Sequence, residues 1–195
     1  MDAFLEHWLE EVLVTPGATA IKARDDARGA LLDDALRAIS VLERWPGPVV
    51  DVGSGGGTPG IPLAVSLPTR SFTLLEAERR KCAFLERMTD CLGNVTVAWG
   101  RAEEQPTDLF GVALAKALAK PPVATELCLP LVAPGGAAIL WLGETADRGA
   151  VATVAEMLGA RLEEDTDGLV VLRKLRETPP GFPRRPGMAK KRPLA

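Results

Sequence analysis

The amino-acid sequence predicts an α/β fold of the Rossmann-like type, in which helices cover both faces of a mostly parallel, twisted sheet. Two observations carry this prediction. An apolar, β-branched run at residues 49–52 leads directly into a glycine-rich turn and then into a helical pattern at 60–67. Short apolar runs alternate with helical patterns along most of the chain, which is typical of right-handed βαβ units. A chain of 195 residues can bury the core of one such domain.

Two helical patterns precede the first strand. Apolar residues recur at helical spacing over residues 2–14 and again over 25–44, and the Trp-Pro-Gly-Pro sequence at 45–48 ends the second pattern. We expect these helices to form a short cap at residues 1–46, in front of a cofactor-binding α/β core at 47–175.

The later elements follow in regular order. A strand at 169–174 is expected to pair antiparallel near an edge of the sheet, and the other strands are expected to be parallel. Residues 1–175 should therefore make a single domain. The expected strands lie at 49–52, 72–75, 94–98, 112–115, 137–142 and 169–174, and the expected helices of the core at 60–67, 78–92, 122–132 and 150–160.

Residues 176–195 form a basic, proline-rich tail. They hold five prolines and six lysines and arginines, and we expect them to be extended rather than packed. The net charge of −3 is uneven, because residues 173–195 carry eight basic residues against Glu177 alone and the rest of the chain is acidic. An acidic body with a basic tail indicates a nucleic-acid partner, and a solvated, disordered end is the alternative. On the first interpretation the tail attracts RNA, and the cofactor site lies wholly in the body.

The composition argues against several classes of protein. No apolar run approaches the roughly 20 residues of a membrane span, and the N-terminus lacks the pattern of a signal peptide. The cysteines Cys82, Cys91 and Cys128 form no CxxC pair, so we expect reduced thiols in a cytoplasmic protein without a membrane partner. His7 is the single histidine, which leaves a His-based metal site or a catalytic triad without support, and no metal is expected.

The glycine-rich turn predicts a nucleotide-cofactor site. Glycines allow backbone N–H groups to approach a ligand closely, and a helix N-terminus adds free donors. Gly55-x-Gly57-x-x-Gly60 fits the dinucleotide fingerprint. Asp51-x-Gly53-x-Gly55-x-Gly57 fits the loop of S-adenosylmethionine (SAM) methyltransferases instead. A purely structural tight turn is the third interpretation.

Two further segments favour SAM over a nicotinamide cofactor. Glu76 ends the second strand and is placed to bind ribose hydroxyls, which both cofactors have. The acidic segment at 100–104 follows the third strand, where SAM enzymes commonly border the adenine. Pro59 and Pro62 remove amide donors from the helix start, which is unusual for a dinucleotide site.

With these motifs, the chain resembles the bacterial small-subunit ribosomal RNA (guanine-N7)-methyltransferases, the RsmG or glucose-inhibited division protein B-like family. The resemblance covers roughly residues 18–195. The Pro-Gly-Ile-Pro sequence at 59–62 and the tail are specific to the family, whereas the other segments are general to methyltransferases. The segments that carry it lie at 51–64, 73–77, 81–85, 101–104, 129–136 and 178–194.

The resemblance implies a class I SAM-dependent methyltransferase that methylates N7 of a guanine in 16S ribosomal RNA. SAM would be the cofactor, and small-subunit RNA or the 30S subunit would be the partner of a monomeric enzyme. Lys116 would lie between cofactor and nucleotide and act in catalysis. The implied cofactor-binding residues are Asp51, Gly53, Ser54, Gly55, Gly57, Thr58, Glu76, Ala102, Glu103 and Lys116, and the implied RNA-binding residues are Arg184, Arg185, Lys190, Lys191 and Arg192.

The chain departs from the family pattern at three places near the expected substrate. A His-x-x-Asp-Ser pattern is replaced by Ala30-Leu-Leu-Asp-Asp, so Ala30 stands in place of the histidine. A Ser-Arg-Ala sequence reads 115–117 Ala-Lys-Ala, and Leu142 replaces a lysine. Two alternatives therefore stay open: a methyltransferase acting on another RNA or a small molecule, and a SAM- or ribosome-binding homologue without turnover.

Overall fold

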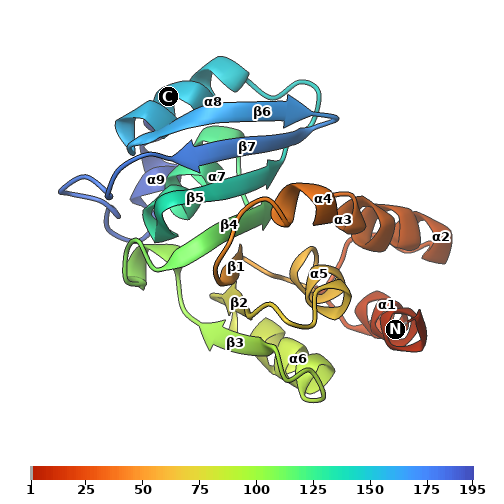
Figure 1. Ribbon diagram of the computed structural model, residues 1–195. Helices are drawn as coiled ribbons and strands as arrows, with labels where there is room; N and C mark the ends of the chain where they lie inside the picture. Colours follow the sequence, from red (N-terminus) through yellow and green to blue (C-terminus); the bar gives the residue numbers. More distant parts are fainter. Residues whose placement is uncertain (1) are drawn as a thin grey trace.

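The computed structural model describes residues 2–195 and contains a seven-stranded sheet in the order β3-β2-β1-β4-β5-β7-β6 (Figure 1). The first five strands are parallel, and β7 pairs antiparallel with both β5 and β6. The predicted α/β fold with a mostly parallel sheet is confirmed. The strands are β1 (Val49–Val52), β2 (Phe72–Glu76), β3 (Val95–Trp99), β4 (Phe110–Lys116), β5 (Val132–Trp141), β6 (Ala160–Thr166) and β7 (Leu169–Lys174).

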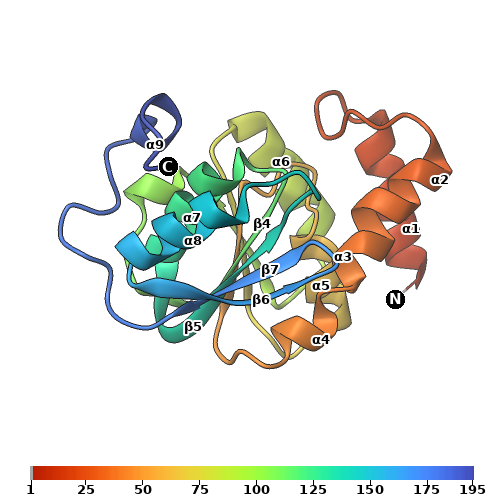
Figure 2. The same cartoon turned by 90° about the horizontal axis from the view of Figure 1, so that it is seen from above.

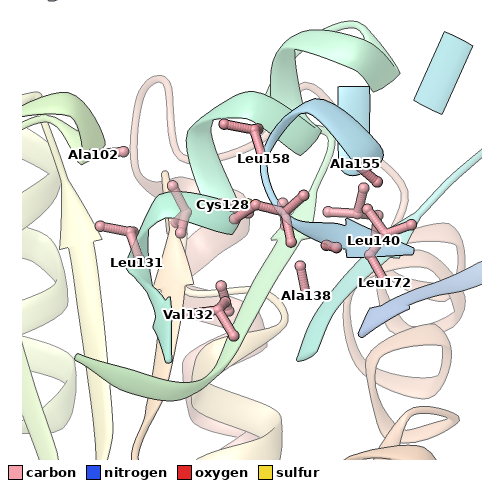
Figure 3. Close-up of a cluster of buried hydrophobic side chains, with 14 of the residues drawn as sticks. Ala102, Cys128, Leu131, Val132, Ala138, Leu140, Ala155, Leu158 and Leu172 are labelled. Atoms are coloured by element: carbon pink, nitrogen blue, oxygen red, sulfur yellow. The ribbon is translucent and has the colours of Figure 1, made fainter. Parts of the chain in front are cut away.

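Helices cover both faces of the sheet (Figures 1 and 2). On one face, α7 (Pro121–Cys128) and α8 (Arg148–Met157) pack on β4, β5 and β7 through a cluster that includes Leu140 and Leu158 (Figure 3). On the other face, α1 (Asp2–Val14), α5 (Gly60–Ser66) and α6 (Arg79–Thr89) enclose the fully buried Trp8. Because both faces are covered, β1 is buried along its whole length, as its apolar run predicts.

The second helix of the cap differs from the prediction of one regular helix. It consists of α2 (Arg24–Ala27), a π-helical turn at Arg28–Asp33, α3 (Asp34–Leu36) and α4 (Ile39–Leu42). The π-helical turn contains Gly29, which weakens a regular helix, and it buries the adjacent Leu31 and Leu32 together. Such turns are frequent at functional sites, and this one delivers Asp34 to the end of β4, as described below.

The edge strand β6 was not predicted. Residues 150–160 were expected to be helical, but α8 ends at Met157 and β6 begins at Ala160. The Asp167-Gly168 turn that joins β6 to β7 has positive φ angles of 51° and 80°, which is the geometry of a tight β-hairpin. The sequence of β6 is acidic and gives no apolar alternation by which a strand could be predicted, because a strand at the edge of a sheet needs few apolar residues. Similarly, the helix expected at 122–132 is α7 followed by a 3₁₀ turn at Leu129–Leu131.

The expectation of an extended, unpacked tail is wrong. Residues 188–191 form the short helix α9 (Met188–Lys191), and Ala189 is 2% exposed. Just before the tail, the buried Lys174 donates from Nζ to the carbonyl of Leu129 and to Thr178 Oγ1, both at 2.8 Å. Composition does not reveal that Glu126 of the body pairs with Arg184 of the tail and so holds the tail on the fold. The division at residue 175 into a domain and a tail stays a prediction.

Candidate cofactor and substrate site

A cavity of about 820 Å³ opens at the carboxyl ends of the parallel strands, where ligands bind in such sheets. Eight of the residues predicted to bind a cofactor line it, and so does Lys190 of the tail. The eight are Gly53, Ser54, Gly55, Thr58, Glu76, Ala102, Glu103 and Lys116. Their individual roles stay predictions, but the fold brings them to one space.

The glycine loop between β1 and α5 combines two kinds of glycine. Gly57 has a φ of 98°, and a Cβ there would overlap the Ile61 side chain and lie 3.2 Å from Trp8 Nε1, so this glycine is required by packing. Gly57 does not line the cavity, contrary to its predicted role as a direct ligand. Gly55 has a φ of 56°, and the nearest atom to a Cβ there would be 3.8 Å away. The loop therefore leaves open space beside Gly55. The indole of Trp8 fastens it from the other side by donating to the carbonyl of Gly56 at 2.9 Å.

Glu76 holds the loop against the end of β2. Its Oε2 accepts from the amide of Gly55 at 2.9 Å, and its Oε1 accepts from the amide of Glu78 at 2.8 Å. A carboxylate has about four acceptor positions, so two remain for the hydroxyl groups of a ligand. Glu76 is thus fixed in place by backbone donors while it still faces the cavity.

Asp51 lies beneath the glycine loop rather than in the cavity. The side chain is 1% exposed, and its Oδ2 accepts from the amide of Gly60 at 3.1 Å, at the start of α5. Burial, opposed by this hydrogen bond and one from Ser54, raises the pKa of Asp51 from 3.8 to about 7. The prediction that Asp51 contacts the cofactor directly is therefore corrected: the residue supports the loop from below.

This raised pKa predicts a pH-dependent stability. The folded protein keeps the proton of Asp51 between pH 3.8 and about 7, where the unfolded chain releases it. The contribution of Asp51 to the free energy of unfolding therefore falls as the pH rises through this range. In Asp51→Asn, the amide oxygen can still accept from Gly60, and this contribution is absent. Urea unfolding at several pH values should therefore show that the free energy of unfolding of Asp51→Asn, minus that of the wild type, increases as the pH rises from 3.8 to about 7. An unchanged difference would contradict the assignment.

The tail supplies one wall of the cavity. Gly187, Ala189, Lys190 and Pro193 line it, and the amide of Gly187 donates to Glu103 Oε1 at 2.8 Å. Sequence reasoning placed the tail away from the cofactor and missed this wall. The sequence signal for this wall is the family-specific motif in the tail. Residue spacing cannot reveal that the tail contacts Glu103, because the two segments lie far apart in the chain.

A bidentate ion pair anchors the tail to α7. Arg184 Nε and Nη2 each lie 2.6 Å from an oxygen of Glu126, whose side chain is 4% exposed. The pKa of Arg184 is raised by its hydrogen bond to Glu126. Arg184 is consequently engaged inside the fold and is not free to bind a phosphate as predicted. Arg185, Lys190, Lys191 and Arg192 are exposed.

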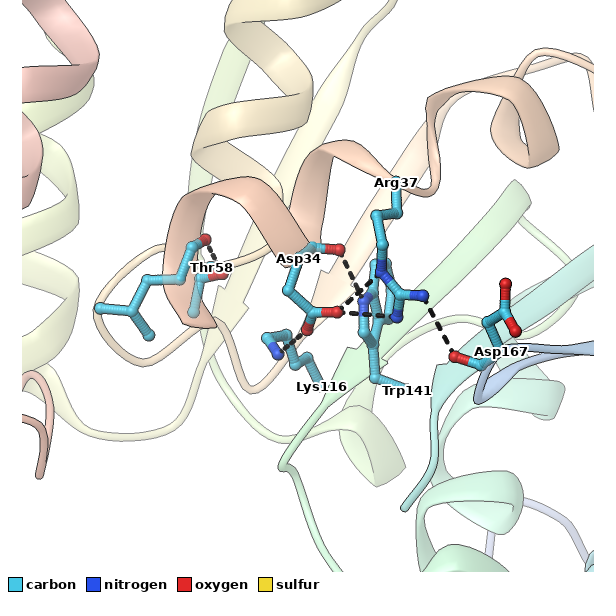
Figure 4. Close-up of polar contacts among 7 residues, drawn as sticks. Asp34, Arg37, Thr58, Lys116, Trp141 and Asp167 are labelled. Carbon is cyan, nitrogen blue, oxygen red and sulfur yellow. Dashed lines mark hydrogen bonds and ion pairs between the residues drawn. The ribbon is translucent and has the colours of Figure 1, made fainter. Parts of the chain in front are cut away.

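Lys116 stands at the end of β4, between two cavities. It lines the large cavity and also a second one of about 380 Å³. Its Nζ forms an ion pair with Asp34 of the cap (Figure 4). Lys116 thus lies beside the large cavity on the side of a second space, and its predicted role in catalysis stays a prediction.

Other loops complete the large cavity without having been predicted. Ala18 and Thr19 come from the segment after α1, and Leu118 to Lys120 come from the loop after β4. Among residues 2–195 there is no cluster of His, Cys, Asp or Glu suited to hold a metal ion. Over the same residues, every helix is too short or too polar to cross a bilayer.

Comparison with known proteins identifies the family. A family model described as rRNA small subunit methyltransferase G matches residues 12–166. The chain belongs to this family. The ribosomal RNA small subunit methyltransferase G of Synechococcus sp. (strain JA-2-3B'a(2-13)) is 34% identical over 189 residues, which cover 83% of this chain and 72% of the relative. The protein of the same name from Rubrobacter xylanophilus is 38% identical over an alignment of 199 positions, gaps included, that covers 87% of this chain and 70% of the relative.

Solved structures support the methyltransferase fold of this family member. A T. thermophilus 16S rRNA methyltransferase, in complex with AdoMet and guanosine, superposes with a TM-score of 0.51 at 15% identity, over 70% of this chain and 37% of that one. The pyocyanin biosynthetic protein PhzM gives a TM-score of 0.63 at 13% identity, over 77% and 56% of the two chains. At such identities the likeness concerns the fold alone. The resemblance predicted from the sequence motifs is confirmed by the family match.

Proposed function

We propose that this protein transfers the methyl group of SAM to N7 of a guanine in 16S ribosomal RNA. The observation that carries the proposal is the glycine loop with Glu76 bonded to the Gly55 amide, at the edge of an open cavity, in a chain of the rRNA small subunit methyltransferase G family. The residues present fit SAM. Open space beside Gly55 can admit the methionine end, and Glu76 keeps acceptor positions for the ribose hydroxyls.

The reaction needs little from the protein beyond placement. SAM supplies an electrophilic methyl group when it is bound. The N7 lone pair forms the new bond to that carbon while the carbon–sulfur bond breaks and its electron pair stays on sulfur. N7 carries no proton, so no general base is required. The reaction is therefore compatible with a chain whose single histidine, His7, lies in α1. Holding two reactants in line can lower the barrier by about 7–11 kcal/mol.

The basic residues of the tail are proposed to bind phosphates. Arg185, Lys191 and Arg192 are exposed on the tail and carry positive charge beside the cofactor cavity. Phosphate contacts of this kind supply affinity without sequence information. The partner is then small-subunit ribosomal RNA or the 30S subunit, and we propose that the enzyme acts as a cytoplasmic monomer.

Methyl transfer to small-subunit RNA from an undermethylated strain tests the function. We expect one N7-methylguanine, revealed by chemical cleavage of the RNA at the modified base. Methyl groups found only on pyrimidines, on protein or on small molecules would contradict the proposal. SAM binding without any transfer would instead support the homologue that has lost turnover.

A further inference from the structure

The second cavity lies beside the cofactor cavity at the carboxyl end of β4. Lys116 and Ala117 line both cavities and so form a shared wall. The volume of about 380 Å³ is within the range of small-ligand sites. A group held in the second cavity would therefore lie next to the occupant of the first, with Lys116 and Ala117 beside both.

Groups of opposite charge stand next to each other at the shared wall (Figure 4). Asp34 pairs with Lys116 through Oδ2 and lies 2.7 Å from Arg37 through Oδ1. The side chains of Lys116 and Asp34 are 17% and 26% exposed, so they are partly shielded from water and still reach the cavity. An ammonium has three donors, so Lys116 can bind a further ligand. A carboxylate has about four acceptor positions, and Lys116 with Nε and Nη2 of Arg37 occupies three of those of Asp34. A ligand with two donors therefore has to displace one contact of Arg37, whose side chain is 42% exposed.

An aromatic side chain completes the cavity. Trp141 ends β5 and lines the cavity, and its Nε1 donates to the carbonyl of Asp34 at 3.2 Å, which fixes the indole relative to the charged pair. Arg37 also lines this cavity and donates to the carbonyl of Asp167 at 3.2 Å. Proteins commonly hold an unstacked base by an aromatic side chain together with polar groups at the base edge.

We propose that this cavity holds the target guanine, with Lys116 donating to O6, Asp34 accepting from N1–H and the 2-amino group, and Trp141 stacking on the ring. The assignment rests on the proposed function. Guanine presents the acceptor O6 next to the donor N1–H, and Lys116 beside Asp34 has the complementary order. Since O6 adjoins N7 on the ring, a base bound in this way turns N7 toward the shared wall. Adenine presents a donor and an acceptor in the reverse order and is repelled by the same pair.

Asp34 then acts as a positioning residue whose effect grows during the reaction. N1–H becomes more acidic as N7 acquires the methyl group and the ring becomes cationic. The hydrogen bond to the Asp34 carboxylate therefore strengthens in the transition state, and the proton stays on N1. Interactions that strengthen in this way raise kcat as well as affinity.

Single-atom changes in the RNA test the assignment. Once the methylated guanine is mapped with the wild-type enzyme, ligated RNA can carry inosine, which lacks the 2-amino group, at that position. We expect inosine to lower kcat/KM about tenfold for the wild type, in line with the discrimination of a bidentate base contact. For Asp34→Asn, guanine and inosine should differ less than about twofold. Asp26→Asn, a change of the same kind on the exposed face of α2, should keep the full penalty for inosine.

A second pair tests Lys116 independently of the fold of Asp34→Asn. 6-Thioguanine keeps N7, N1–H and the 2-amino group but replaces O6 with sulfur, a weak acceptor. Replacing the target guanine with 6-thioguanine should lower kcat/KM for the wild type and leave kcat/KM unchanged for Lys116→Met. Equal penalties for inosine in wild type and Asp34→Asn, or for thioguanine in wild type and Lys116→Met, would overturn the inference. A wild-type enzyme that methylates no guanine at all would instead overturn the proposed function.

Discussion

Gly55→Leu is expected to abolish SAM binding while the domain stays folded. The backbone of Gly55 has a φ of 56°, and a Cβ there meets nothing closer than 3.8 Å, so the leucine side chain enters the space proposed for the methionine end. The left-handed backbone conformation costs about 1–2 kcal/mol for a residue with a Cβ, which a domain of this size tolerates. Isothermal titration calorimetry with SAM should show no measurable binding, and circular dichroism should show retained structure.

Gly135→Leu is the matched control for this change. Gly135 lies in β5, away from the cavity, with a φ of 88° and open space around its Cβ position. It therefore carries a comparable backbone strain without filling the site. We expect normal SAM affinity for Gly135→Leu. Normal affinity for Gly55→Leu would show that the loop does not hold the cofactor.

Arg184→Ala is expected to release the tail and to weaken SAM binding at least about tenfold. The substitution leaves the carboxylate of Glu126 buried without its partner, and breaking such a pair costs about 3 kcal/mol. The released tail takes Gly187, Lys190 and Pro193 away from the cavity wall. This expectation reverses the one drawn from composition, in which the tail serves RNA alone. Calorimetry with SAM and proteolysis of the tail measure the two effects.

Two further variants separate charge from anchoring. Arg185→Ala removes the same charge from the neighbouring, exposed position and should leave SAM affinity unchanged. Adding Glu126→Gln to Arg184→Ala replaces the stranded charge with a neutral amide and should restore part of the lost stability. If Arg184→Ala and Arg185→Ala bind SAM equally well, the tail has no part in the cofactor site.

The parallel core and the cofactor loop could be predicted from local sequence. The run at β1 is apolar because it is covered on both faces, and the glycines mark a turn with positive φ angles that few other residues adopt. Glu76 was found because strands with parallel neighbours bring their carboxyl ends to one edge. The strand β6 was missed because its exposed, acidic sequence gives no apolar signal.

The rest of the site depends on contacts between distant segments. Nothing local to Asp34 indicates that a π-helical turn brings it to Lys116, 82 residues later in the chain. Nothing local to Glu126 shows that it binds Arg184. The tail was interpreted from its charge, its prolines and its family resemblance, none of which shows what it packs against. Asp51 shows the opposite error: its position in the motif predicted a ligand contact, whereas its hydrogen bond to Gly60 makes it a support.

The position of Trp141 on the wall of the second cavity also has an optical consequence. The chain contains four tryptophans and no tyrosine, so its fluorescence comes from indole groups alone at excitation wavelengths that phenylalanine does not absorb. Trp141 lies beside the proposed base, and Trp8 is bonded to the glycine loop. The protein thus carries one intrinsic fluorophore bonded to the loop of the proposed cofactor site and another on the wall of the proposed base site, and neither needs a chemical label.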